Sequence, residues 1–159
     1  MQLGINEGKQ GTLMLANKGI ELFTKLGESE KLIRAFTLQA HAFRQLGNIN
    51  KAINVFIKNE ELIQSAYLPQ KLKNSLGANM KLQTAISLMR ESEKKKDLAL
   101  YNHAKKLFKH ANKFYLDFDN ESWRKLALIR EAELYVKNSN INDADKILGD
   151  FEDYCEISI

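Results

Sequence analysis

The chain has 159 residues, of which 44% are hydrophobic and 28% are charged. This balance excludes an intrinsically disordered chain and is sufficient for a domain with a sizeable core. The net charge of +4 comes from Lys and Arg that are interspersed with Asp and Glu, so charge alone gives little support for a nucleic-acid partner.

The composition favours helices. The sequence has one proline, Pro69, and eight glycines, so long helices with short connections are expected. The one cysteine, Cys155, excludes an internal disulfide. No run reaches the roughly 18 apolar residues that span a bilayer, and the N-terminus lacks a basic region followed by an apolar run. We therefore expect no membrane insertion.

Apolar residues at three- and four-residue spacings predict three helices in the first part of the chain. The first covers 11–26. The second runs from Ser29 to the glycine stop at Gly47. The third follows Asn50, a plausible N-cap, and ends before Pro69, because proline disfavours helical geometry in the residue before it.

Four more helices are predicted in the rest of the chain. A long helix begins near Pro69 and is expected to end in the crowded charges of 91–96. Asp97 caps the next helix, and the last two open near Ser122 and Asn142. No pattern of alternating residues competes with these seven helices, so the chain is predicted to be all-α.

A short phrase occurs twice between amphipathic helices. Asn48-Ile49-Asn50-Lys51-Ala52 returns as Asn140-Ile141-Asn142-Asp143-Ala144, which is typical of a repeated helical hairpin. Around the first copy, the segment 33–62 resembles a tetratricopeptide repeat (TPR). The residues that carry this resemblance are Phe36, Ala40, Phe43, Gly47, Ala52 and Phe56, whereas Asn59 stands where the repeat has a small residue. A weaker match is carried by Ala132, Tyr135, Ala144, Leu148 and Phe151.

The resemblance implies a right-handed α–α superhelix. In this interpretation the chain is a single domain over 1–159, with hairpins at 31–66, 69–116 and 121–155 and an unpaired helix at 11–26. The lengthened, irregular repeats resemble those of bacterial regulatory and signalling proteins, and the chain could be a fragment of such a protein.

The resemblance also implies a ligand-binding surface. In the family the first helix of each hairpin lines a concave groove, which places Arg34, Thr37, His41 and Arg44 on that groove. The two arginines could hold a carboxylate, and His41 could titrate between about pH 5 and 8. Solvent-exposed polar residues without a ligand explain this strip equally well.

The long fourth helix adds amide side chains to the candidate groove. Amides donate and accept hydrogen bonds at once, so they can bind a peptide backbone without reading its side chains. The residues of this type are Asn74, Asn79 and Gln83.

No group of residues points to catalysis, a metal or a cofactor. His41, His103 and His110 lie on different helices or seven residues apart, which does not suit a metal site, and Cys155 has no indicated histidine partner. The basic run Lys105-Lys106-Lys109-Lys113 could meet phosphates, but a solvated face is the favoured interpretation.

The sequence therefore predicts a non-enzymatic scaffold that binds a protein or a peptide. It would be the sensor or interaction module of a bacterial regulatory protein in the cytoplasm, although an excised soluble domain of a membrane-anchored protein fits the same sequence. Two alternatives stay open: a dimerisation element of a larger signalling protein, which would form a homodimer, and, less favoured, a nucleic-acid-binding helical domain.

Overall fold

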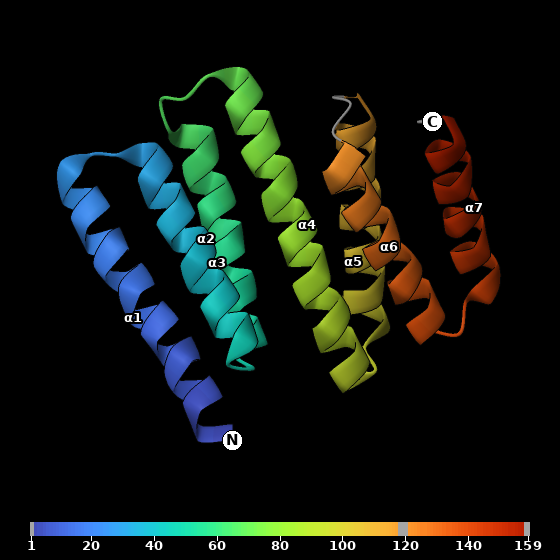
Figure 1. Cartoon of the computed structure of the whole chain (residues 1–159), viewed down its shortest axis with the longest axis horizontal. Helices are drawn as coiled ribbons and strands as arrows, with labels where there is room; N and C mark the ends of the chain where they lie inside the picture. The colour runs from blue at the N-terminus through green and yellow to red at the C-terminus, as the bar shows by residue number, and fades with distance from the viewer. Residues whose placement is uncertain (1, 118–120, 158–159) are drawn as a thin grey trace. The chain divides into compact units, whose positions relative to one another are not determined.

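The structure is a computed structural model that describes the backbone of residues 2–117 and 121–157 and the side chains of residues 7–117 and 122–149. The described backbone forms seven helices and no strand (Figure 1), so the prediction of an all-α chain with seven helices is confirmed. The helices are α1 (Gln2–Leu26), α2 (Ser29–Gln45), α3 (Ile49–Ser65), α4 (Gln70–Lys95), α5 (Leu98–Asp117), α6 (Glu121–Lys137) and α7 (Ile141–Ile157).

Some helix ends differ from their predicted positions. The first helix, α1, begins nine residues before Gly11, because glycine weakens a helix interior without ending it. The prediction of Asn50 as an N-cap is wrong: Asn48 holds that position, and its carbonyl oxygen accepts the Ala52 N–H at 3.1 Å. At the start of α5, Asp97 is confirmed as the cap, since its Oδ1 accepts the N–H of Ala99 at 2.8 Å.

Helix α4 ends within the charged segment 91–96, as expected, but only at the far end of that segment. The helix continues through Lys95, because the charges fall at helical spacing: Lys95 Nζ lies 2.8 Å from Glu91 Oε1, one turn earlier, and such pairs support a helix. Helix α4 ends only where Lys96 takes a positive φ of 53°.

The two copies of the repeated phrase follow the same helix-ending turn. Gly47 and Ser139 have positive φ angles of 81° and 58°. The next N–H, of Asn48 or Asn140, donates across the turn to the carbonyl oxygen of Phe43 or Tyr135, at 2.9 Å in both cases. This is the Schellman pattern, in which a left-handed residue closes a helix. The sequence repeat thus corresponds to a repeated local structure.

The chain separates into two compact units whose boundary lies inside α4. The first unit comprises Met1–Ser87 and the second Leu88–Ile159.

In the first unit, α2 packs closely against both α1 and α3. Small residues permit this approach: Ala40 and Ala52 are fully buried, and a Cβ on Gly19 would lie only 3.4 Å from Ala35 Cβ. The helix expected to be unpaired, α1, therefore lies along α2 (Figure 1). The core between these helices and α4 contains Ile33, Phe56, Ile63 and Met80.

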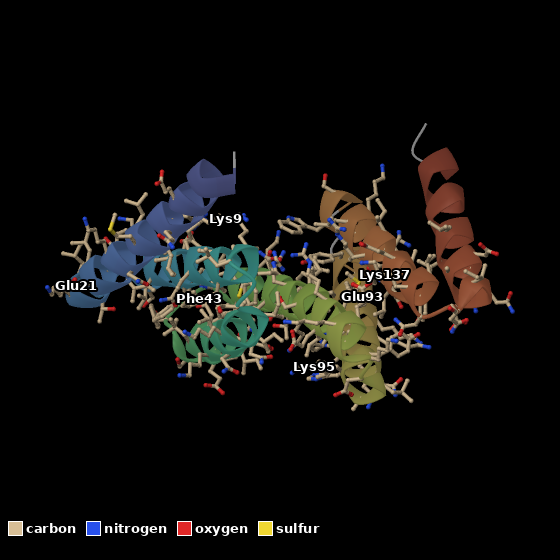
Figure 2. All side chains as sticks on the ribbon, turned by 90° about the horizontal axis from the view of Figure 1, so that it is seen from below. Lys9, Glu21, Phe43, Glu93, Lys95 and Lys137 are labelled. Atoms are coloured by element: carbon tan, nitrogen blue, oxygen red, sulfur yellow. The ribbon has the colours of Figure 1, made fainter. Side chains whose placement is uncertain are left out.

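In the second unit, α6 packs closely against both α5 and α7. Its core combines buried alanines with aromatic rings, namely Ala104, Phe108, Ala111 and Tyr115 of α5, Ala127, Ala132, Leu134 and Tyr135 of α6, and Ala144 of α7. The last turns of α4 are tied to α6 by Lys137, whose Nζ lies 3.0 Å from Glu93 Oε2; Figure 2 shows these two side chains together.

Candidate functional site

Five of the seven predicted ligand residues lie between helices of the first unit, in two hydrogen-bonded groups. His41, Arg44, Asn79 and Gln83 form one group, and Thr37 forms the other with Asn59. We call the two groups together the polar cluster; it consists of Thr37, His41 and Arg44 on α2, Asn59 on α3, and Asn79 and Gln83 on α4. Helix α4 does not approach α2 or α3 as closely as those two approach each other. Side chains therefore bridge the space between α4 and the other two helices.

The guanidinium of Arg44 makes most of the bridge from α2 to α4. Its Nη2 donates to Gln83 Oε1 at 2.9 Å, and its Nη1 lies 3.4 Å from the Gln83 carbonyl oxygen. The guanidinium also lies over the Phe56 ring, 5.7 Å from the ring centre. These contacts hold Arg44 in one place, so it is an ordered part of the first unit.

His41 is neutral in this cluster. Arg44 Nη2 lies 2.8 Å from His41 Nδ1, and because arginine can only donate, Nδ1 must accept and the imidazole proton is on Nε2. Burial, together with the nearby positive charge of Arg44, lowers the pKa of His41 to about 4. The expectation that His41 titrates between pH 5 and 8 is therefore wrong, because both effects disfavour the charged ring.

The three amide residues of α4 that were predicted as ligands do not all lie in the same place. Gln83 Nε2 lies 3.3 Å from Asn79 Oδ1 within the polar cluster, whereas Asn74 accepts a hydrogen bond at 2.8 Å from Gln70 on its own helix. The polar cluster therefore includes Asn79 and Gln83 but not Asn74.

Asn59 is the member of the polar cluster that the sequence did not predict. It is almost fully buried, and its Nδ2 donates to the Ile33 carbonyl oxygen at 2.9 Å and to Thr37 Oγ1 at 3.0 Å. Its signal in the sequence was its departure from the small residue of the repeat. A polar side chain at a position that faces a neighbouring helix indicates a buried hydrogen bond.

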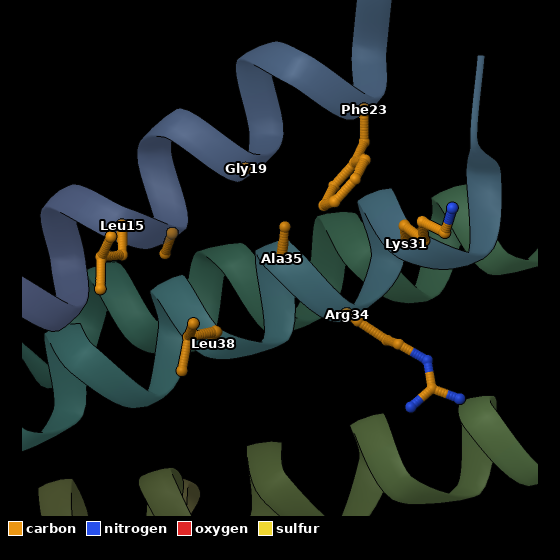
Figure 3. A pocket seen from close by; sticks show the side chains of 8 residues that line it. Leu15, Gly19, Phe23, Lys31, Arg34, Ala35 and Leu38 are labelled. Carbon is orange, nitrogen blue, oxygen red and sulfur yellow. The ribbon is translucent and has the colours of Figure 1, made fainter. Parts of the chain in front are cut away.

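Arg34, the remaining predicted ligand residue, lies at a different place. Its Nη2 lies 2.7 Å from Glu30 Oε1 in an exposed ion pair, and its side chain borders a groove between α1 and α2. Figure 3 shows Arg34 extending away from α1 at the edge of this groove. Arg34 and Arg44 thus do not converge on one ligand position.

The groove between α1 and α2 is lined mainly by apolar side chains and has a volume of about 300 Å³. In Figure 3, Leu15 and Phe23 extend from α1 towards α2, Gly19 leaves a space between them, and Ala35 points back from α2. We call this the α1–α2 groove; its lining residues are Leu15, Ala16, Gly19, Phe23, Lys31, Arg34, Ala35 and Leu38. Leu15 is 65% exposed and Leu38 is 42% exposed.

Neither a metal-binding group nor a membrane-spanning helix is found in the part of the chain that the structure describes. The described residues contain no group of three or more His, Cys, Asp or Glu side chains placed to hold a metal ion, and the side chain of Cys155 lies outside the described residues. Within the described ranges, none of the helices combines the length and the apolar character needed to cross a bilayer.

Comparisons with protein-family models, with curated proteins and with solved structures find no match to this chain.

Proposed function

We propose that this chain is a protein-binding scaffold of helical hairpins and that a segment of its partner docks in the α1–α2 groove. The observation that carries the proposal is the apolar surface of that groove, where Leu15 and Leu38 remain largely exposed on opposite sides of a hollow. Apolar side chains gathered around a hollow are typical of interaction sites.

The groove selects the chemistry of the partner. Gly19 and Ala35 are small and lie close together where α1 and α2 meet, so an apolar side chain of the partner can rest over them in the groove. Burying a leucine-sized side chain contributes about 1.5–3 kcal/mol. Lys31 and Arg34 border the groove, and each is paired with a glutamate of this chain, Glu28 or Glu30, in an exposed ion pair. Exposed pairs are weak, so these cations can exchange that partner for an acidic residue next to the docked side chain. A groove between two helices suits the apolar face of an amphipathic helix.

The resemblance to TPR hairpins supports the same class of function, because that family binds proteins and peptides. We extend the proposal to the setting that the resemblance implies, an interaction or sensor module of a bacterial regulatory protein. Within the polar cluster the side chains already hydrogen-bond to one another, so we assign its members to holding α2, α3 and α4 together. Of the predicted ligand residues, Arg34 is the one that borders the proposed site.

Selection of displayed random peptides on the purified chain tests the proposal. The test variant is Leu15→Glu with Leu38→Glu, which places two charges in the groove without touching a buried residue. The matched control is Leu98→Glu, which charges an equally apolar leucine, 69% exposed, at the start of α5. We expect selected peptides to carry an apolar residue beside an acidic one, and their affinity for the test variant to fall about ten- to hundredfold.

Two outcomes would contradict the docking site. The first is that the selected peptides bind the test variant as tightly as they bind the original chain. The second is that the control variant loses as much affinity for the peptides as the test variant does. Sedimentation equilibrium on the same variants addresses the dimerisation alternative: a dimer that the groove charges dissociate would identify the occupant of the α1–α2 groove as a second copy of the chain.

A further inference from the structure

The second unit contains a small polar pocket onto which three lysines converge. Lys105 and Lys109 come from successive turns of α5, and Lys146 comes from α7. The pocket has a volume of about 160 Å³, and its other lining residues are Tyr135, Asp143 and Ile147.

One of these lysines is already neutralised. Lys105 Nζ lies 3.4 Å from Asp143 Oδ2 and 4.9 Å from the centre of the Tyr135 ring. The same Asp143 oxygen accepts a hydrogen bond from Asn140 Nδ2 at 2.7 Å. Asp143 is therefore oriented by two donors and offers its charge mainly to Lys105.

The other two lysines add to the positive charge of the pocket. Neither Lys109 nor Lys146 forms an ion pair with any residue that the structure describes. Like charges that line one small hollow repel each other, and this repulsion is relieved when an anion binds between them.

A buried carboxylate next to the pocket provides a competing explanation for the lysines. Glu131 is 1% exposed, and burial raises its pKa even though Lys109 and Lys105 act in the opposite direction. Its two oxygens already accept hydrogen bonds, one from Asn112 Nδ2 and the other from the Tyr135 hydroxyl. Lys146 is not among the charges that act on Glu131, so Glu131 does not account for the third lysine.

We propose that this pocket binds a phosphate-sized oxyanion, either free phosphate or the phosphate group of a monoester, with Lys109 and Lys146 as its principal ligands and Lys105 as a third donor. Ammonium groups bind phosphate as point charges and need no fixed planar geometry. The proposal goes beyond protein binding and is independent of it, because the pocket lies in the second unit and the α1–α2 groove in the first.

The pocket favours a single oxyanion over a nucleic-acid strand. Lys106 and Lys113 belong to the same basic run of α5 but do not line the pocket. A nucleic acid would use all of these lysines along the helix, since each phosphate contact adds to the affinity. A single phosphate group needs only the three lysines that converge.

The test is a titration of the full chain, followed by amide NMR shifts, with inorganic phosphate and separately with O-phosphoserine. Sodium chloride at equal ionic strength and unmodified serine are the ligand controls. The test variants are Lys109→Gln and Lys146→Gln, and the matched controls are Lys106→Gln and Lys113→Gln, which remove the same charge from α5 outside the pocket. We expect saturable shifts around the pocket, an affinity about tenfold lower in each test variant, and less than about a twofold change in the controls.

The two titrations distinguish free phosphate from a phosphate monoester. Saturable binding of phosphate, of O-phosphoserine or of both supports the pocket and shows which form it accepts. If Lys109→Gln fails to fold because Glu131 lies close to it, the exposed Lys146→Gln variant alone decides the test. Absence of saturable binding by both ligands would overturn the proposal. So would equal losses in the test and control variants, which would indicate an extended basic face instead of a pocket.

Discussion

Asn59 offers a sharp test of the interior of the first unit. Its Nδ2 donates to the Ile33 carbonyl oxygen at 2.9 Å and to Thr37 Oγ1 at 3.0 Å. Its Oδ1, also buried, accepts no hydrogen bond from the described part of the chain. The site therefore stabilises a donor. The Thr37 hydroxyl, which could donate to a carboxylate, already donates to the Ile33 carbonyl oxygen at 2.9 Å.

Two substitutions separate the lost hydrogen bonds from the effect of charge. Asn59→Ala removes two hydrogen bonds worth about 1 kcal/mol each, so the free energy of unfolding should fall by about 2 kcal/mol. Asn59→Asp removes the same bonds and also buries a carboxylate against two acceptors. Because an uncompensated buried charge costs about 3–5 kcal/mol, this variant should be the less stable of the two at pH 7.

The pH dependence gives the sign of the charge effect. Burial without a donor raises the pKa of an aspartic acid above the value of about 3.9 in an unfolded chain. The stability of Asn59→Asp is then highest below about pH 3.9 and is lost as the pH rises through the folded-state pKa. Relative to Asn59→Ala, the loss should be about 1.4 kcal/mol for each pH unit between the two pKa values.

Urea unfolding followed by circular dichroism at pH 4.5 and pH 7.5 measures both effects. The Asn59→Ala variant is the control at each pH, since it lacks the titrating group. The reasoning is refuted if Asn59→Asp and Asn59→Ala unfold at the same urea concentration at both pH values, because the amide would then not act as a donor in a dry site.

Three further predictions concern single residues. Burial raises the pKa of Glu131, so its contribution to stability is full below about pH 4.3 and is lost as the pH rises through the folded-state pKa. In urea unfolding, the free energy of unfolding of Glu131→Gln should therefore increase relative to that of the original chain as the pH rises. Gly47 has a φ of 81°, so Gly47→Ala should lower the free energy of unfolding by about 1–2 kcal/mol in thermal or urea unfolding. Gly11 lies inside α1, and a new Cβ there would have nothing within 4 Å, so Gly11→Ala should raise the free energy of unfolding by up to about 1 kcal/mol. His41 should titrate near pH 4 by NMR, and Arg44→Met should raise its pKa by removing a nearby positive charge.

Each of these has an outcome that would contradict it. A constant difference between Glu131→Gln and the original chain across pH 4–8 would mean that Glu131 does not titrate abnormally. Equal effects of the two glycine substitutions would argue against the left-handed turn at Gly47. A His41 midpoint near the ordinary value of about 6.5 would show that the ring is hydrated and not held against Arg44.

Local features of the sequence predicted the helices well where the pattern was strong. Gly47 and Asp97 were placed correctly because a helix stop and an N-cap depend on residues within about one turn of each other. Helix α6 was harder to define: its apolar residue Ile129 is 46% exposed. Its apolar residues lie on more than one face, so periodicity does not define a single buried side.

The sequence by itself determined the helical class, the number of helices and the repeated turn, because helical spacing and capping act between residues at most five or six positions apart. Only the tertiary structure decided what the polar residues do. Arg44 and Gln83 are 39 residues apart in the chain, yet they hydrogen-bond across α2 and α4, and Lys146 joins Lys105 and Lys109 only because α5 and α7 both pack on α6. Periodicity shows which face of a helix is apolar, but which helices meet, and at what distance, depends on side-chain packing between segments far apart in the sequence.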